Sequence, residues 1–489
     1  MYFLEYWLKT VTKVEGFAAE GFVITTLAIF IALVLAFRHF REGQGENRFL
    51  LIVNMNRLTI GLCLSLLVTY LVLLIAGPVH FNTPYGFYSD HIIYVFRIFL
   101  VAFFIGYFFY LAAQTNPHLY YTFEYYFIMF GAMLGLSIMC ICSNFLNLLL
   151  AMELYSVCIY YLINDKRGSI KTHEAAFKYF VVSSFSTAFY IFGVFWVYYN
   201  FGSFEYQALS IVALKGSVVG AIGYFFILCA LMVKVGAGVF FFWVLDAYEG
   251  ASYPILIFLN LFVKPVFLLV IFKAAILSGS LALFWIFQKL FFASAMLGSL
   301  GAALQSKIKR FLIFTSLYNT GFLSCFFWDP SYHMLNGFIA FFFIYTVNSF
   351  CLMYTFSQLV NEKAKFVIVD IKDLSSIMPQ DSRFAFALIY FLLAISGLPP
   401  FSLFFVKYYL FFKFAHVGIG YVLILLLTSA IATFYYIRTV RLILQDRRPT
   451  FLLTLRKANA RMFAFVTVFN LYFVFFAEHL IEFLNNLPL

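Results

Sequence analysis

The sequence predicts an all-α polytopic membrane protein with about fourteen transmembrane helices. Of its 489 residues, 64% are hydrophobic and only 11% are charged, too few charges to cover a soluble protein of this length. Apolar runs of about twenty residues, the length that crosses a bilayer as a helix, recur along the chain. Backbone groups in lipid must be paired internally, and these runs are too long and uniform to be the strands of a barrel.

The expected spans follow the apolar runs. They are 21–38, 57–77, 91–113, 121–141, 143–164, 175–200, 217–243, 253–277, 281–304, 310–328, 334–358, 383–415, 418–437 and 461–485. The seventh is interrupted by Gly236 and Gly238, and a tight polar turn is expected at 246–250. The twelfth is too long for one plain span and contains Gly397-Leu-Pro-Pro400, so it should be broken. We expect 361–383 to be a lateral or interfacial connector with a short amphipathic piece.

Charge in the loops predicts the sidedness. The loops after helices 1, 5, 9 and 13 are basic, whereas those after helices 2, 4 and 10 carry no Lys or Arg. The basic residues are Arg38, Arg41, Arg48, Lys166, Arg167, Lys171, Lys307, Lys309, Arg310, Arg438, Arg441, Arg447 and Arg448. An even helix count then puts both termini on the less basic side.

The same asymmetry explains the net charge of +11, so nucleic acid is not an expected partner. The seven cysteines are scattered in apolar runs, and Cys140 and Cys142 form a lone C-x-C pair without a second cluster. A zinc site needs four ligands, so we expect no metal and interpret these cysteines as small apolar residues.

A hidden duplication is predicted within a single membrane domain, 1–489. Helices 4 to 8 (121–278) and helices 9 to 13 (279–440) each form a unit of five, and an odd number of spans per unit gives inverted repeats. The fourth helix of each unit is the interrupted one, with Lys234 beside one break and Lys407 after the other. Helices 1 to 3 (1–120) and the last helix (441–489) flank the repeats.

Four ionisable residues lie near the middle of their spans: Glu153, Lys234, Lys264 and Lys407. Lys234 is about nine residues from the nearer end of its run, roughly 14 Å, which is too deep for snorkelling. Charged groups inside spans are costly and mark ion paths. A desolvated lysine can load and release a proton near neutral pH, so a changing Glu–Lys distance would couple motion to protonation. The alternative is a buried Glu153–Lys234 ion pair that only fixes packing.

Other polar groups give weaker signals. Glu174 and Lys178 are spaced i,i+4 at the start of helix 6, as either a solvated surface pair or the entrance to a path. Lys273 and Arg97 lie close enough to helix ends to snorkel. The chain has no Gly-rich phosphate loop after a strand and no His or Cys cluster for haem or iron–sulfur ligation, so any redox chemistry belongs on a partner.

Five local patterns carry a family resemblance. They are Glu153-Leu-Tyr-Ser156 with Tyr160 and Leu162; Glu174-Ala-Ala-Phe-Lys178; Lys234 with Trp243 and Asp246-Ala-Tyr-Glu-Gly250; 305–310 with Thr315, Ser316 and Gly321; and Gly397-Leu-Pro-Pro400 with Phe404, Phe405 and Lys407. In this order and spacing they resemble the antiporter-like, proton-pumping subunits of respiratory complex I, NADH:ubiquinone oxidoreductase. The 246–250 sequence favours the subunit 2 branch, and the chain ends soon after helix 14, without the long lateral helix of subunit 5.

The resemblance implies a proton-translocating module without a cofactor of its own. NADH, flavin, iron–sulfur clusters and ubiquinone would be on partner subunits, and the partners would be other membrane-arm subunits, sister antiporter-like subunits and lipids. The chain would not be a free monomer. The implied location is the inner mitochondrial membrane, with both termini in the intermembrane space. The seventy phenylalanines suggest an AT-rich, organellar gene.

The resemblance also assigns roles to single residues. Glu153 and Lys234 would be a coupled pair, Lys264 the central relay and Lys407 the lysine of the second half-channel, with Glu174, Lys178, Ser316 and Asn319 in support. The chain departs from the family at Val239, where Pro is common, and at Phe241 and Asn319, where His is common. Asn319 can form hydrogen bonds but cannot titrate. Two alternatives remain: a cation/proton antiporter subunit of the same fold, and a structural subunit that has lost pumping.

Overall fold

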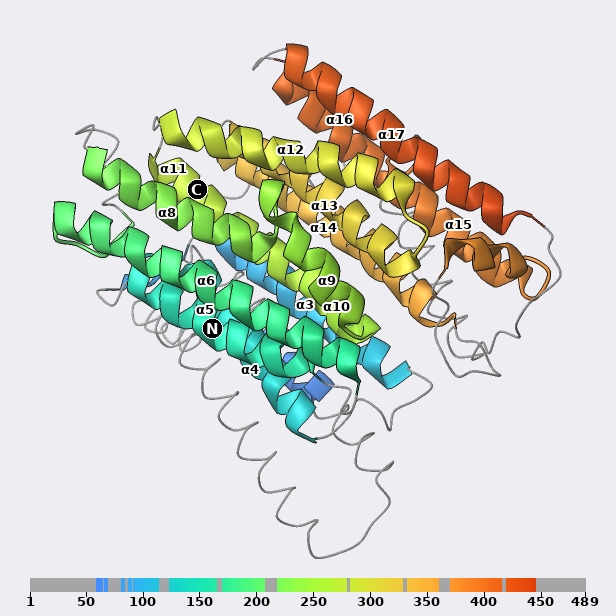
Figure 1. Cartoon of the computed structure of the whole chain (residues 1–489), viewed down its shortest axis with the longest axis horizontal. Coiled ribbons are helices and arrows are strands. Elements are labelled where there is room, and N and C mark those ends of the chain that lie inside the picture. Colours follow the sequence, from blue (N-terminus) through green and yellow to red (C-terminus); the bar gives the residue numbers. More distant parts are fainter. Residues whose placement is uncertain are drawn as a thin grey trace, which may run out of the picture.

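A computed structural model describes residues 59–64, 66–68, 81–83, 87–89, 91–113, 123–164, 169–206, 218–278, 282–328, 332–359, 370–415 and 419–445. The longer helices are α3 (His91–Ala113), α4 (Phe123–Ile141), α5 (Phe145–Ile163), α6 (Ile170–Phe201), α8 (Val218–Val235), α9 (Phe242–Gly250), α11 (Lys264–Ser278), α12 (Ala282–Leu304), α13 (Ile308–Cys325), α14 (Tyr332–Ser357), α15 (Ser382–Ser396), α16 (Ser402–Phe414) and α17 (Ile419–Ile443). They lie side by side in one slab, with α4 to α6 at one end and α15 to α17 at the other (Figure 1).

The chain is a multi-pass membrane protein. Nine helical segments within the described residues are long and apolar enough to cross a bilayer. The expected helices at 21–38 and 461–485 lie outside the described residues, and 57–77 is described only in part. The total of fourteen therefore stays a prediction.

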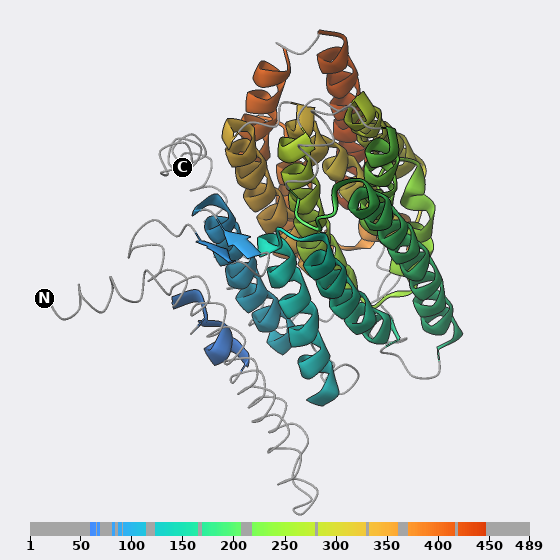
Figure 2. The same cartoon turned by 90° about the vertical axis from the view of Figure 1, so that its left-hand side faces the viewer.

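Three details of the expected elements are corrected. Helix α6 begins at Ile170 rather than at residue 175, because the Ser169 side chain accepts from the backbone N–H of Thr172 and caps it. The expected tight turn at 246–250 is wrong, since these residues form the last turns of α9. The fold is also not wholly α-helical: the strands β1 (Phe81–Thr83) and β2 (Phe87–Ser89) form a small antiparallel hairpin (Figure 2).

The expected interruption of helix 7 is confirmed, and glycines produce it. Helix α8 ends at Val235, Ala237 is extended, and the chain resumes through the 3-10 turn η2 (Gly238–Phe241) into α9. Gly236 and Gly238 have φ values of 66° and 61°, a left-handed conformation that costs glycine little. A Cβ on Gly236 would also collide with Val244, so the break has room only for glycine.

The expected break in helix 12 is confirmed as well. Helix α15 ends at Ser396, Gly397 has φ 77°, and α16 begins at Ser402. Pro399 and Pro400 supply no backbone N–H, so the helical ladder cannot run through them.

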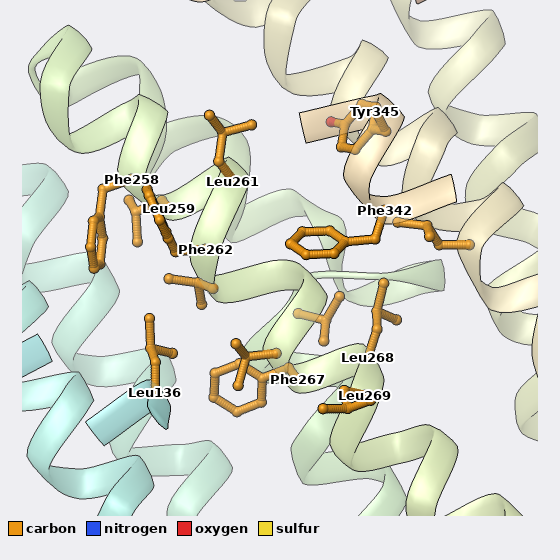
Figure 3. Packing of buried hydrophobic residues seen from close by; sticks show 14 of the residues in the cluster. Leu136, Phe258, Leu259, Leu261, Phe262, Phe267, Leu268, Leu269, Phe342 and Tyr345 are labelled. Atoms are coloured by element: carbon orange, nitrogen blue, oxygen red, sulfur yellow. The ribbon is translucent and has the colours of Figure 1, made fainter. Parts of the chain in front are cut away.

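A span that is buried over most of its length forms the centre of the bundle. It comprises α10 (Tyr253–Phe258), the π-helical turn η3 (Leu259–Val263) and α11. Figure 3 shows its Phe258, Phe262 and Phe267 packed between neighbouring helices, with Leu136 on one side and Phe342 on the other. Lys264 directly follows the π turn, a distortion that often marks functional sites.

Basic residues from separate loops lie at one end of the bundle. The Glu249 carboxylate at the end of α9 accepts from Lys307, at 2.7 Å, and from Arg310, both at the start of α13. Arg438 of α17 donates to the carbonyl of Ala303 at the adjoining end of α12, at 3.1 Å. This agrees with the charge asymmetry expected from the loops. The described part of the 361–383 connector contains the 3-10 helix η5 (Ile371–Ser376).

Candidate functional site

The first buried lysine bonds to a serine rather than to a glutamate. Lys234, in the last turn of α8, is 7% exposed and its Nζ donates to the Ser183 Oγ of α6 at 2.6 Å. Glu153 of α5 is half-buried, and among the described residues no ion pair joins it to Lys234. The direct Glu153–Lys234 ion pair of the packing-only alternative is therefore not formed among the described residues. Sequence reasoning missed Ser183, which no local motif marks.

An aromatic cluster joins the surroundings of two lysines. The Trp243 ring of α9 lies between Tyr179 of α6 and Tyr248 of α9, with centroid distances of 5.8 Å and 6.2 Å. The Tyr248 ring in turn lies 5.6 Å from the Nζ of Lys264. Such contact between an ammonium and a ring is favourable, more so away from water. We call Tyr179, Trp243 and Tyr248 the aromatic bridge.

The second lysine, Lys264, has a hydroxyl partner across the helix interface. It is 2% exposed and its Nζ donates to the Ser316 Oγ of α13 at 2.6 Å. The Ser316 hydroxyl also donates to the Ile313 carbonyl at 2.7 Å. The family resemblance gave Ser316 only a supporting role, and the structure makes it the direct partner of the lysine.

The third lysine, Lys407 of α16, bonds back across the break in its own helix. It is 2% exposed, and its Nζ donates to the Ser396 carbonyl at 3.0 Å and lies 3.3 Å from the hydroxyl of Tyr318. Its ammonium also lies 5.1 Å from the Phe322 ring centroid. The carboxyl end of α15 carries partial negative charge, which stabilises an ammonium there.

Helix α13 connects the second lysine with the third. Ser316 contacts Lys264 and Tyr318 contacts Lys407, two residues apart on the same helix. Asn319 beside them is fully buried and its Nδ2 donates to the Thr315 carbonyl at 2.9 Å. Its Oδ1 has no hydrogen-bond partner among the described residues. A buried amide oxygen of this kind is a natural acceptor for a water molecule.

The expected pair at the start of α6 belongs to an exposed cluster. Lys178 is paired with Glu174 at 2.7 Å and with Asp246 of α9 at 2.9 Å, and all three side chains are exposed in this chain. Asp246 was not predicted as a partner, because 68 residues separate it from Lys178.

Four other residues complete the account of the expected site. Val239 is half exposed in η2, and Phe241 is buried against Phe242. The expectation that Arg97 snorkels is wrong, because this residue is buried within the protein and only 1% exposed. Lys273 turns inward and donates to the Cys140 carbonyl.

In the part of the chain that the structure describes, no group of three or more His, Cys, Asp or Glu residues could hold a metal ion.

Comparison with known proteins identifies the family. The family model described as NADH:quinone oxidoreductase/Mrp antiporter, TM, matches residues 142–433, which include all three buried lysines and Glu153. This chain belongs to that family. The match covers both broken helices and the buried central span.

Curated members of the family extend the comparison. NADH-ubiquinone oxidoreductase chain 2 of Arabidopsis thaliana is 27% identical, over 80% of each chain, and chain 2 of Marchantia polymorpha is 31% identical, over 62% of this chain and 63% of its own length. NADH-quinone oxidoreductase subunit N 1 of Acidiphilium cryptum is 28% identical, over 66% of this chain and 69% of its own length.

Solved structures support the same fold. A chain of respiratory complex I from Thermus thermophilus, with bound aureothin, matches with a TM-score of 0.75 at 21% identity, over 92% of this chain and 96% of that one. A chain of the Mrp complex from Dietzia sp. matches with a TM-score of 0.80 at 16% identity, over 96% of both. At these identities the likeness concerns the fold alone.

Proposed function

We propose that this chain is a membrane-arm subunit of respiratory complex I that translocates protons, driven by electron transfer from NADH to ubiquinone on other subunits. The observation that carries the proposal is the set of three lysines, each almost fully buried and each bonded to a hydroxyl or carbonyl oxygen. The curated relatives named as NADH-quinone oxidoreductase subunit N or chain 2 support the choice of enzyme. The redox cofactors would then lie on partner subunits.

The proton path would begin at Glu153 and Lys234. The Ser183 hydroxyl both donates and accepts, so it can relay a proton to or from the Lys234 ammonium. Motion that brings Glu153 closer would favour the charged lysine, and motion away would favour proton release. The energy scale is adequate, because moving one charge across 100 mV takes about 2.3 kcal/mol.

The path would continue through Lys264 to Lys407 along α13. The Ser316 hydroxyl would relay a proton to or from Lys264, as Ser183 would for Lys234. The Tyr318 hydroxyl lies within hydrogen-bond distance of the Lys407 ammonium. Asn319, on the same helix, would not titrate, and we propose that its Oδ1, which has no partner among the described residues, holds a water molecule on the way from one lysine to the other. A polar side chain that orders water would thus replace the histidine common in the family.

The roles of the exposed surfaces follow from their apolar character. Only about a third of the α6 span is buried within the chain (33%), and less of the α17 span (28%), with side chains such as Phe185 and Leu427 largely exposed. Helices α6 and α17 lie toward opposite ends of the slab (Figure 1). Large apolar patches mark partner or lipid contacts. We assign them to neighbouring membrane-arm subunits, including sister antiporter-like subunits, with lipid between, and place Glu174 and Lys178 at the α6 contact.

The remaining assignments rest on the relatives and on the loops. Mitochondrial relatives support a place in the inner mitochondrial membrane and an organellar gene. The gathered basic end would face the matrix, which puts both termini in the intermembrane space. The two broken helices support inverted repeats of five helices at 121–278 and 279–440.

Replacing Lys264 with methionine tests the proposal. Methionine keeps the length and apolar stem of the side chain and removes the titrating group. The matched control is Lys289→Met, because Lys289 is an exposed lysine on the neighbouring α12. We expect both variants to assemble on a native gel, and only Lys264→Met to lose NADH:quinone turnover and proton pumping together. Full pumping by Lys264→Met would refute the proposed path.

A cation/proton antiporter subunit is the second candidate, favoured by the likeness to a chain of the Mrp complex. Copurification separates the two functions: a complex I subunit isolates with NADH dehydrogenase subunits, and an antiporter subunit isolates without them. A purely structural subunit is disfavoured, because three buried lysines that have no carboxylate ion-pair partner among the described residues are costly to keep without a role.

A further inference from the structure

Helix α17 turns hydroxyl groups toward the interior of the bundle. Most of the helix is exposed in this chain, but four of its seven buried residues carry hydroxyls, namely Thr428, Tyr435, Tyr436 and Thr439. The two threonines donate to carbonyls of their own helix, Thr428 to that of Leu425 at 2.9 Å and Thr439 to that of Tyr436 at 2.7 Å. A tyrosine hydroxyl stands too far from its own backbone for such a bond. The two tyrosines therefore need partners from outside α17.

Neither tyrosine hydroxyl has such a partner within the described part of the chain. Tyr435 and Tyr436 are 1% and 0% exposed, and neither hydroxyl forms a hydrogen bond to a described residue. The Tyr436 hydroxyl lies near those of Tyr435 and Thr315 without bonding to them. Packing alone would be served by phenylalanine, of which this chain has seventy. Because water molecules commonly pair buried polar groups of this kind, the two hydroxyls indicate water held between the helices.

Helix α13 connects these two tyrosines with the third buried lysine. The Phe311 ring lies 5.5 Å from the Tyr435 ring and 6.0 Å from the Tyr436 ring, centroid to centroid. Tyr318, seven residues further along α13, is on the same face of that helix, about 10 Å further from the basic end. Its hydroxyl lies 3.3 Å from the Nζ of Lys407. One face of α13 therefore leads from the tyrosine pair to the lysine.

On its other side, the tyrosine pair approaches the basic end of the bundle. Phe311 directly follows Arg310, one of the basic residues of that end. Arg438 follows Tyr436 by two residues on α17, is exposed, and donates to the Ala303 carbonyl at the end of α12. The two unpartnered hydroxyls thus lie between the charged surface and the buried lysine.

We propose that Tyr435 and Tyr436 hold water molecules that, together with the Tyr318 hydroxyl, form a proton route between the basic end and Lys407. The proposal rests on the proposed function of Lys407 as a proton carrier. In each step a tyrosine oxygen accepts one proton from the group on one side and gives its own to the group on the other. The tyrosines stay neutral, and one proton reaches the Lys407 amine. Lys407 then exchanges protons with the basic side directly, in addition to the path through the other lysines.

A double variant, Tyr435→Phe with Tyr436→Phe, tests the route because it removes both hydroxyls and keeps both rings against Phe311. Tyr421→Phe is the matched control, because Tyr421 lies near the other end of α17 and packs its ring against Trp328 at 4.4 Å. We expect both variants to assemble on a native gel. If the double variant does not assemble, the two single substitutions take its place.

The first readout is a high-resolution structure of the assembled complex, which does not depend on proton pumping. We expect an ordered water molecule within hydrogen-bond distance of the Tyr435 or Tyr436 hydroxyl in the unaltered chain and in Tyr421→Phe. In the double variant this water molecule should be lost. Hydroxyls that bind no water molecule in the unaltered chain overturn the proposal, whether or not the chain pumps protons.

The second readout is coupled NADH:quinone turnover and pumping, combined with Tyr318→Phe. If the three hydroxyls form one route, the double variant lowers both rates about fivefold or more and adds little to the loss caused by Tyr318→Phe. Unaltered rates in the double variant, or losses that multiply when the substitutions are combined, would overturn the proposal. Failure of the proposed function is a separate result, seen as full pumping by Lys407→Met, and it leaves the bound water molecules in place.

Discussion

Replacing Gly397 with alanine should disable the second half of the path. The backbone there has φ 77°, and the new Cβ would lie 2.9 Å from both the Cδ and the Nζ of Lys407. The left-handed conformation costs a non-glycine residue about 1–2 kcal/mol. Displacing the ammonium from the Ser396 carbonyl removes a charge-assisted hydrogen bond worth about 1.5–3 kcal/mol. If the loss of this hydrogen bond raises the barrier to proton transfer by the same amount, turnover falls about ten- to hundredfold.

Gly202→Ala separates the cost of backbone strain from the effect of displacing the Lys407 ammonium. Gly202 has φ 69°, nearly the same conformation, but a Cβ there meets nothing within 4 Å. Both variants should therefore lose similar stability from backbone strain, measured as thermal inactivation of the purified complex. Only Gly397→Ala should also lose coupled NADH:quinone turnover and pumping. Equal turnover in the two variants would show that the position of Lys407 does not matter for proton transfer.

Three further predictions concern the ends and middle of the bundle. Glu249→Gln breaks the pairing with Lys307 and Arg310, so we expect a loss of about 1 kcal/mol in stability that shrinks at high salt, measured by thermal inactivation at two ionic strengths. Asn319→Leu should slow turnover severalfold, whereas Asn319→His should keep turnover near that of the unaltered chain. A fully active Asn319→Leu variant would exclude a water molecule held at this residue. Lys178→Gln should leave the stability of the chain itself nearly unchanged, because its ion pairs are exposed. Its effect should instead appear as weaker binding of neighbouring subunits on a native gel.

Much of the fold follows from local sequence. Long apolar runs predict the spans, and the glycines and prolines predict where helices 7 and 12 break, because each acts through its own backbone. The deep position of the lysines is likewise a matter of counting residues within a run. In the structure, these features lie at the positions that the sequence predicts.

The partners of the lysines could not be predicted in the same way. Ser183 lies 51 residues from Lys234, and Ser316 lies 52 residues from Lys264, so only the packing of whole helices brings each pair together. The polar residues within 246–250 favour a turn, yet this segment continues helix α9. The carbonyl of Glu249 at its end is satisfied by Lys309, a donor from a distant helix.

The most direct test of the central claim is Lys234→Met in purified complex reconstituted into vesicles, with electron transfer and proton uptake measured together. The account predicts that the complex assembles, as judged on a native gel, and that NADH:quinone turnover and proton translocation collapse together. Turnover and translocation at the level of the unaltered complex would contradict it, and the buried lysines would then be remnants in a structural subunit.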